Sequence, residues 1–480
     1  MITTQNAEYV SEYLTTLLLD NAKYIPVSQG ISRMGYADGE LTEFVPYSEN
    51  FEYIGDVNYK KLYNSVKRNG SLDEWIKIYK SIDTGTGEPY SIPAKISVLA
   101  SFASVLIAHV KSLLYVFHLW GVSDIGKTVC LRLAASVWGE PDIYVQNMNA
   151  TNVGLERTAH FLCNLPLILD ELQTIRDENL SKLIYLVSQG QGRTRGSAEG
   201  VQNTPDWHNT VITTGEQPLT SEKSAGGEFN RVFDVYCDKK IFSNPEEIYS
   251  VTSKNYGWAG FAFILAIVGG YGEVLEMLTN NRVDLSFADL KQKFEKWQLY
   301  IKNAEKENTG GKKRMCTALL LLADELVNII FLGLPENEAQ NKSCEFFGLL
   351  TKYIEPKNDT DVVRRAYDYI LTWIAENKCK FAQKTAAPSD NEIASNVINA
   401  IASEIRMPEV WGKFETKDSV FISGKILKDI LDEGGYSYEL TINEFNKRGW
   451  TVMAENQDKA TKRLRLSGIA VCGVEIKTEL

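Results

Sequence analysis

The residues best suited to chemistry lie together at 121–128, where the sequence reads GVSDIGKT. Gly121 and Gly126 allow a backbone turn so tight that successive N–H groups can point at phosphate oxygens. Lys127 can reach the β- and γ-phosphates of a nucleotide, and the Thr128 hydroxyl can ligate Mg²⁺. The spacing therefore predicts a binding site for ATP and Mg²⁺ that is made of Gly121, Val122, Ser123, Asp124, Ile125, Gly126, Lys127 and Thr128.

The elements on either side fit this prediction. The run at 113–120 has the length and the aromatic and β-branched content of a buried strand. From Thr128 the residues TVCLRLAASVWG have helical spacing and stop at Gly139, with Pro141 beyond it. A helix that begins here places the partial positive charge of its N-terminus beside the phosphates. The alternative, a chance glycine-rich turn with a surface lysine, requires neither element.

An acidic pair follows the next long apolar run. Residues 165–172 read LPLILDEL, which is a buried strand ending in Asp170 and Glu171. Asp170 can hold Mg²⁺ through water, and Glu171 can polarise the water that attacks the γ-phosphate. The alternative is that both acids only begin the next helix, where acids are favoured. A further buried strand ends near Thr214 and Glu216, and polar residues at that end of a strand lie where ligands bind in such sheets.

Three arginines are candidates for contact with phosphate. Arg193 and Arg195 lie in a glycine-rich loop or hairpin at 190–202, which suits phosphate contact as well as it suits a solvated surface loop. Arg231 comes just before the strand-like run VFDVYC. A lone arginine is usually a surface or ion-pair residue, but in an oligomeric nucleotide hydrolase it could reach the γ-phosphate of the neighbouring subunit.

The composition is that of an ordinary water-soluble protein. The 480 residues carry a net charge of −11, which argues against a generally basic nucleic-acid coat but allows a local basic channel. The seven cysteines form no C-x-x-C pair, and the N-terminus lacks the features of a signal peptide. We therefore expect reduced thiols, a cytoplasmic location and no membrane, with the apolar stretches at 96–120 and 258–270 inside the core.

The pattern along the chain predicts four regions. They are a small α+β region at 1–90, an α/β core at 91–250, a helical lid or support at 251–383, and a final region at 384–480. Within them we expect single helices over 62–82, 258–279, 344–355 and 362–382, and a strand over 142–148. Arg314 lies in the first turn of another helix, where cations oppose the helix dipole, so a nearby anion would explain it.

The last region has the outline of a winged helix-turn-helix, with two helices followed by a two-stranded ribbon. Four cations lie near the ribbon and could contact DNA, although many such domains bind only protein. These cations are Lys459, Lys462, Arg463 and Arg465.

Several segments, in this order, resemble the P-loop domain of an uncharacterised-domain family in phage and mobile-element proteins. They are GVSDIGKTVCLRLAASVWG, TNVGLE, LPLILDEL, IYLVSQGQGRTRG and VITTGE. Family members in staphylococcal cassette and pathogenicity-island elements are MCM-like AAA+ replicative helicases. The resemblance implies an α/β P-loop AAA+ ATPase core with a helical lid, a small α+β N-terminal region and a C-terminal winged helix. It also implies a hexameric ring that acts on single-stranded and possibly double-stranded DNA, and a possible element-encoded replication partner.

The resemblance also assigns roles. Lys127 and Thr128 match the P-loop, and Asp170 and Glu171 match the Walker B acids. The stretch with Arg193 and Arg195 is similar to a hairpin that touches single-stranded DNA in the pore. Arg231 looks like the arginine finger, Arg314 is similar to the sensor-2 arginine, and Thr214 or Glu216 stands where an asparagine sensor is usual.

Two other classes of function stay open from the sequence. One is an ATPase switch that hydrolyses ATP without moving along DNA. The other is an initiator whose winged helix dominates and whose ATP only licenses assembly. The first would lack DNA-stimulated turnover, and the second would show site-specific DNA binding with little unwinding.

Overall fold

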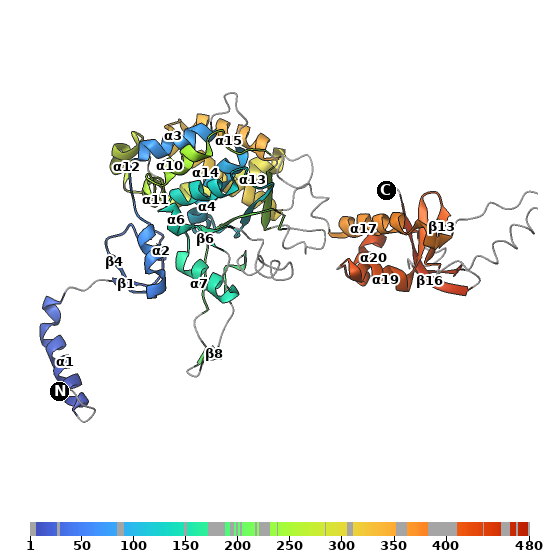
Figure 1. Cartoon of the computed structure of the whole chain (residues 1–480), viewed down its shortest axis with the longest axis horizontal. Coiled ribbons are helices and arrows are strands. Elements are labelled where there is room, and N and C mark those ends of the chain that lie inside the picture. The colour runs from blue at the N-terminus through green and yellow to red at the C-terminus, as the bar shows by residue number, and fades with distance from the viewer. Residues whose placement is uncertain are drawn as a thin grey trace, which may run out of the picture. The chain divides into compact units, whose positions relative to one another are not determined.

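The computed structural model divides the chain into two compact units, and we describe each by itself (Figure 1). The first comprises Met1–Leu219, Arg231–Glu305 and Gly311–Tyr353, and the second includes Ile354–Leu480. The structure describes residues 6–25, 29–83, 91–147, 151–170, 188–192, 196–197, 200–201, 204–216, 218–219, 231–237, 239–283, 285–304, 311–351, 362–382, 410–434, 436–452, 461–466 and 469–478.

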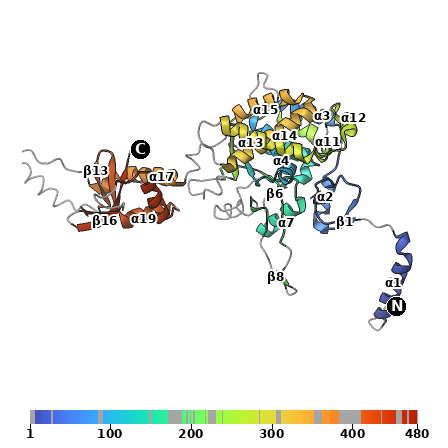
Figure 2. The ribbon, with the colours of Figure 1, turned by 180° about the vertical axis from the view of Figure 1, so that it is seen from behind.

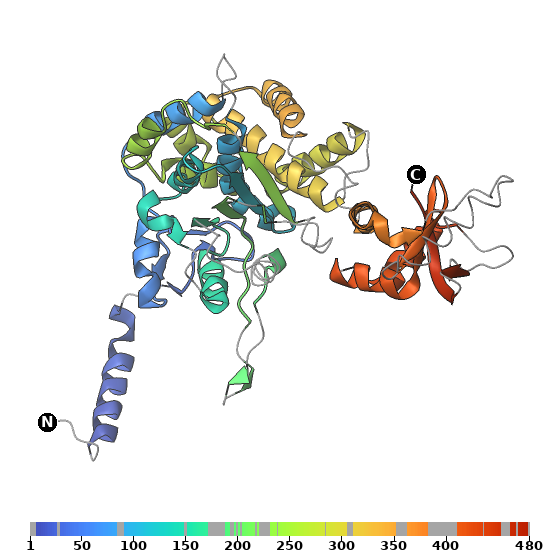
Figure 3. The ribbon, with the colours of Figure 1, turned by 45° about the vertical axis from the view of Figure 1, so that its right-hand side comes forward.

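A five-stranded parallel sheet forms the centre of the first unit (Figure 3). Its three inner strands are buried almost throughout, as parallel strands covered by helices on both faces must be. The carboxyl ends of all five strands lie at one edge of the sheet. The three inner strands carry predicted site residues at that edge. The order is β11 (Val232–Cys237), β5 (Val116–Gly121), β10 (Val211–Gly215), β7 (Leu167–Asp170) and β6 (Gln146–Asn147).

Helices pack around this sheet, and the long helix α4 (Ile92–Val110) is central among them (Figure 2). All residues of α4 except Ala108 are buried. In the part of the chain that the structure describes, two helices, Ile92–Val110 and Lys313–Leu332, are long and apolar enough to cross a membrane, but 89% and 83% of their apolar windows are buried inside the protein. The others are α5 (Lys127–Ser136), α7 (Asn152–Leu162), α10 (Pro245–Thr252), α11 (Trp258–Val268), α12 (Gly272–Thr279), α13 (Phe287–Ala304), α14 (Gly311–Leu332) and α15 (Glu336–Leu350).

Several predicted elements were wrong in extent. The helix expected over 62–82 is two helices, α2 (Lys60–Ser65) and α3 (Leu72–Asp83), because Gly70 between them has φ +68° and lies against the Lys254 carbonyl. The helix expected over 258–279 breaks at Gly269 and Gly270, which both have positive φ.

Two further expectations also need correction. The strand expected over 142–148 is only Gln146–Asn147, because Pro141 opens the short helix α6 (Pro141–Tyr144), where proline is favoured. The helix expected over 344–355 begins earlier, at Glu336.

Among the helices expected to form a lid, α13 and α14 pack against α4, and α15 packs against α14. Buried ion pairs fix them there: Lys95 of α4 lies 2.6 Å from Asp83 of α3 and 2.8 Å from Asp324 of α14, and all three side chains are fully buried. Lys342 of α15 also pairs with Asp83. Burial alone would raise the pKa of Asp83, but Lys95 and Lys342 outweigh it and hold that pKa below its ordinary value.

His109, near the end of α4, gives the unit a predicted sensitivity to acid. The residue is 2% exposed, and its Nε2 lies 2.7 Å from the Tyr36 hydroxyl. Burial lowers the pKa of His109 from 6.5 to about 4. Between these pH values the unfolded chain binds a proton that the folded chain does not, so stability is lost as pH falls.

Because His109 takes up its proton in the unfolded chain, we expect the free energy of unfolding to fall by about 2 kcal/mol when the pH is lowered from 7 to 5. Urea unfolding at both pH values measures the change. The His109→Gln variant should lose this part of the drop, and an equal drop in the variant would assign the acid sensitivity elsewhere.

The N-terminal region is α+β and attaches to the sheet unit. The Met34 amide donates to the Phe161 carbonyl over 2.8 Å, and the Tyr36 amide donates to Asn164 Oδ1 over 3.1 Å. Its helix α1 (Ala7–Asn21) has no buried residue. Its short strands pair as β1 (Gln29–Ile31) with β4 (Phe51–Tyr53) and β2 (Gly35–Tyr36) with β3 (Phe44–Val45).

The described part of the second unit has its own core, in which a sheet packs against three helices. Residues of α17 (Val362–Glu376) such as Tyr367 and Ile370 belong to this core. The prediction that this helix belongs to the helical region at 251–383 is therefore wrong. The other elements are β12 (Phe381–Ala382), β13 (Gly412–Thr416), β14 (Ser419–Ser423), α19 (Gly424–Glu433), α20 (Tyr438–Lys447), β15 (Thr461–Leu466) and β16 (Ile469–Lys477), and the sheet order is β12-β13-β14-β16-β15.

Candidate functional site

The loop between β5 and α5 has the conformation that its glycines predict. Gly121 has φ +133°, and a Cβ there would lie 2.2 Å from the Cys237 carbonyl oxygen, so only glycine fits. Gly126 has φ +104° and is the N-cap of α5. The Ile241 amide donates to the Ile125 carbonyl over 2.9 Å and holds the loop from outside. The result is a backbone turn that leads into the N-terminus of a helix.

Lys127 is folded over this loop. Its Nζ donates to the carbonyl oxygens of Gly121 and Val122 over 2.8 Å and 2.6 Å. The ammonium group and the N-terminus of α5 together concentrate positive charge at the mouth of the turn. Such a site attracts an anion the size of a phosphate.

Acidic and hydroxyl groups from neighbouring strands face the loop. Asp170 ends β7 and accepts a hydrogen bond of 2.5 Å from Thr214 Oγ1 at the end of β10. Ser123 of the loop donates to Glu216 Oε1 over 2.6 Å. Because β10 lies between β5 and β7, its polar end links the loop to Asp170.

A cavity of about 410 Å³ lies at this edge of the sheet. The structure brings eight predicted residues to its wall, and Gly121, Val122 and Ile125 belong to the adjoining loop. Sequence reasoning missed Val129, Gly215 and Pro245; of these Pro245, after Asn244, carried the signal of a helix start. The eight predicted residues are Ser123, Asp124, Gly126, Lys127, Thr128, Asp170, Thr214 and Glu216.

The donor set of this cavity fits a nucleotide phosphate group and Mg²⁺. Lys127 and the start of α5 supply the positive charge that phosphates need. Thr128 and Asp170 line the same cavity and offer the hydroxyl and carboxylate oxygens that Mg²⁺ prefers. Among the described residues, none of α11–α15 lines the cavity, so this part of the expected lid does not cover it.

Arg231 lies at the opposite edge of the sheet. Its carbonyl accepts from the Val116 amide at the start of β5, whereas the Gly121–Thr128 loop follows the end of β5. The length of that strand puts roughly 17 Å between the two edges. The Arg231 guanidinium donates to the carbonyl and hydroxyl oxygens of Ser188, each over 3.2 Å. Arg231 therefore lies too far away to contact the loop of its own chain.

Arg314 lies in the first turn of α14 and is absent from the cavity wall. Burial raises the pKa of Tyr115, which directly precedes β5; Cys316 of α14 adds to that rise, and Arg231 opposes it. Neither of the two predicted arginines therefore lines the cavity of its own chain.

Four predicted site residues lie outside the described residues: Glu171, Arg193, Arg195 and Lys459. The described part of the glycine-rich stretch forms a hairpin, in which β8 (Gly196–Ser197) pairs antiparallel with β9 (Gly200–Val201).

Of the four cations predicted to lie near the ribbon of the second unit, the three that the structure describes differ in position. Arg463 and Arg465 are exposed on one face of β15. Lys462 points to the other face, where its Nζ lies 2.8 Å from Glu475 Oε2. The ammonium of Lys462 is thus occupied by an ion pair within the unit, whereas the two arginines face solvent.

The geometry defines an α/β protein with a glycine-lysine loop and a second unit, and two known families match it in sequence. Residues 1–207 match the "Domain of unknown function (DUF927)", and residues 361–471 match the "Cch helix turn helix domain". The second match spans most of α17 to β16, so the second unit is a helix-turn-helix domain.

Among solved structures, the chain is similar to one described as "SCCmec type IV Cch - active helicase". The sequence identity is 18% and the TM-score 0.66, and the match covers 99% of this chain and 84% of that chain. At this identity the likeness concerns the fold, so the chain has the fold of that helicase. No curated protein matches the sequence.

Proposed function

We propose that the protein is an ATP-dependent DNA helicase, an MCM-like AAA+ translocase that replicates a staphylococcal mobile element as a hexameric ring in the cytoplasm. The observation that carries this proposal is the junction of three strand ends at one cavity: the loop with Lys127 after β5, Thr214 on β10 and Asp170 on β7. The likeness in fold to an active helicase supports it.

In this proposal each residue at the cavity has a separate role in ATP hydrolysis. Lys127 and the amides of the loop bind the β- and γ-phosphates. Thr128 and Asp170 would hold Mg²⁺, which neutralises charge on the phosphates when it is bound. Glu171 orients the attacking water. Thr214 fixes Asp170 by the 2.5 Å hydrogen bond, and Glu216 fixes Ser123 of the loop.

The position of Arg231 supports a ring. An arginine at the far edge of the sheet can stabilise charge on the γ-phosphate only of a neighbouring subunit, and we assign the same task to Arg314. A head-to-tail contact of this kind repeats around a closed ring. Hydrolysis would then move the β8–β9 hairpin, with Arg193 and Arg195, along single-stranded DNA.

The first test is the ATPase rate with and without single-stranded DNA, beside unwinding of a forked duplex. Matched variants are Glu171→Gln, for the water, and Arg193→Ala with Arg195→Ala, for DNA. We expect DNA stimulation that is lost in both variants, with basal turnover kept in the arginine variant. Turnover that ignores DNA yet is lost in Glu171→Gln would make the protein an ATPase switch, and site-specific binding without unwinding would make it an initiator that works with a replication partner.

The helix-turn-helix unit supplies a second DNA contact in this proposal. We expect Arg463→Ala with Arg465→Ala to weaken DNA binding about tenfold or more and to reduce the slope of log K against log salt by about 2, because two phosphate contacts are lost. Fluorescence anisotropy at several salt concentrations measures both. The control is Lys462→Met, which should leave the slope unchanged because that ammonium is paired with Glu475. Equal slopes in all three proteins would assign this unit to protein binding.

A further inference from the structure

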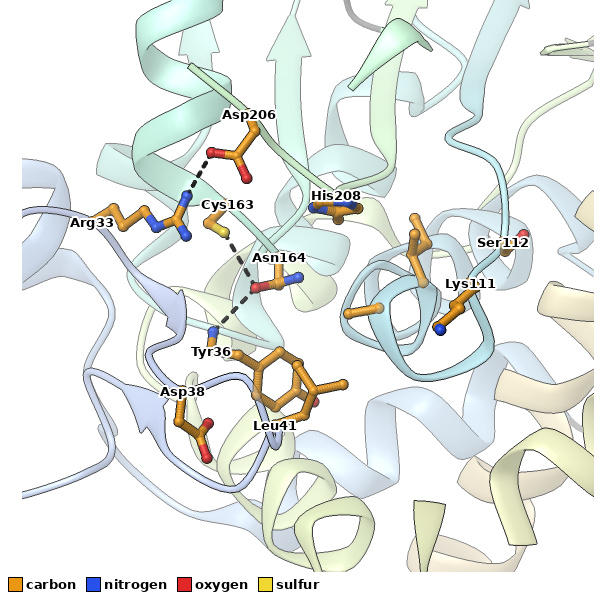
Figure 4. A pocket seen from close by; sticks show the side chains of 12 residues that line it. Arg33, Tyr36, Asp38, Leu41, Lys111, Ser112, Cys163, Asn164, Asp206 and His208 are labelled. Carbon is orange, nitrogen blue, oxygen red and sulfur yellow. Dashed lines mark hydrogen bonds and ion pairs between the residues drawn. The ribbon is translucent and has the colours of Figure 1, made fainter. Parts of the chain in front are cut away.

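Three separate parts of the first unit meet at the side chain and backbone of Asp206. Arg33 of the N-terminal region places Nη1 3.0 Å from Asp206 Oδ1 (Figure 4). His160 of α7 places Nδ1 2.8 Å from the Asp206 carbonyl oxygen and 3.2 Å from its amide nitrogen. The Asp206 carboxylate lies 3.6 Å from the same ring nitrogen. One residue thus contacts the N-terminal region and a helix of the core.

Asp206 is also at the base of the hairpin. It forms an isolated antiparallel bridge with Gln191. Next to that bridge, the Gly192 amide donates to the Pro205 carbonyl over 2.7 Å, and the Trp207 amide donates to the Gly190 carbonyl over 2.9 Å. The two chain segments that lead to β8 and from β9 therefore pair with each other at Asp206, the residue that Arg33 and His160 contact.

The surroundings of the ion pair differ from those of a core contact. A cavity of about 510 Å³ lies beside Arg33 and Asp206 (Figure 4). The two side chains are 31% and 49% exposed. By contrast, the nearby hydrogen bond from the Tyr36 amide to Asn164 is buried. The Arg33–Asp206 pair can therefore break and re-form without disturbing the buried attachment of the N-terminal region.

We infer that Asp206 is a positioning residue that sets the orientation of the hairpin and couples it to the N-terminal region through Arg33. This inference rests on the proposed function, in which the hairpin contacts DNA. A shift of the N-terminal region moves Arg33, and the ion pair passes that shift to the base of the hairpin. Among the described residues, Asp206 does not line the cavity beside the Gly121–Thr128 loop.

The test uses the full-length protein and the variants Asp206→Asn, Arg33→Gln and the charge exchange Arg33→Asp with Asp206→Arg. Hydrogen exchange followed by mass spectrometry on peptides that cover 190–207 reports on the base of the hairpin. We expect the single variants to raise exchange there about two- to fivefold, as the loss of a half-exposed ion pair allows, and to reduce DNA stimulation of ATP turnover by a similar factor. Basal turnover stays within about twofold of the wild type, and the charge exchange restores both readouts.

A matched control is Lys67→Met. Lys67 pairs with Glu140 over 3.3 Å and also joins the N-terminal region to the core, but away from the hairpin. This variant should change neither readout. Faster exchange with unchanged DNA stimulation would overturn the coupling and leave a merely structural contact, and unchanged exchange would overturn the anchoring itself.

A wild-type protein that DNA does not stimulate would defeat the proposed function and the coupling with it. In that case the exchange measurement still decides whether Arg33 holds the base of the hairpin. The two failures are therefore distinguishable.

Discussion

Lys127→Ala is expected to lower ATP turnover by at least about 100-fold, because it removes the one ammonium group that the loop holds over the phosphate site. The bonds from its Nζ to the carbonyls of Gly121 and Val122 keep the side chain folded toward the mouth of the turn. A bound phosphate offers a stronger, charged acceptor in the same place. Steady-state turnover and the affinity for a fluorescent ATP analogue measure the loss.

The control for Lys127→Ala is Lys240→Ala, which removes an exposed lysine that does not line the cavity. This variant should keep normal turnover. If Lys127→Ala retained turnover and affinity within a few-fold of the wild type, the loop would not be the nucleotide site.

Arg231→Ala is expected to reduce turnover by about 1000-fold or more while ATP affinity stays near normal. The reason is the position of Arg231 at the start of β11, far from the loop of its own chain. Its loss removes charge stabilisation from the neighbour's site without touching the binding residues. Turnover and nucleotide affinity, measured on the same preparation, separate the two effects.

Mixing gives the decisive comparison for Arg231. Neither Arg231→Ala nor Lys127→Ala should be active alone, but in a randomly mixed ring about one interface in four joins an intact Lys127 to an intact Arg231. Activity should therefore reappear in the mixture. A mixture that stays inactive, with rings formed, would mean that the arginine acts within its own chain. Ser188→Ala, which removes one acceptor of Arg231, controls for a local structural effect.

The sequence was most informative where spacing and chemistry coincide. The glycines, Lys127 and Thr128 predicted a turn and a helix start, and the structure has both. The apolar run before Asp170 likewise predicted a buried strand end. These predictions depend only on local conformation, because the backbone needs of a tight turn and the apolarity of a buried strand are properties of short segments.

Other features depended on contacts between distant segments. The position of β10 between β5 and β7 brings Thr214 to Asp170, and no local pattern gives a strand order. The period of two in β15 shows that Lys462 and Arg463 lie on opposite faces, but only pairing with β16 decides which face is inward. Gly70 breaks a helix because Lys254 packs against it from far along the chain.

The buried contacts of Lys95 bear on how a subunit can move. Separating Asp83 or Asp324 from that ammonium would break one pair of a fully buried ionic network, and breaking a buried ion pair costs about 3–5 kcal/mol. The helices α3, α4, α14 and α15 are therefore expected to move together as a rigid body, without a hinge at these contacts. In the ring proposed above, a stroke driven by ATP would therefore appear as tilting of whole subunits against each other, with the mechanical work done at the interfaces between subunits.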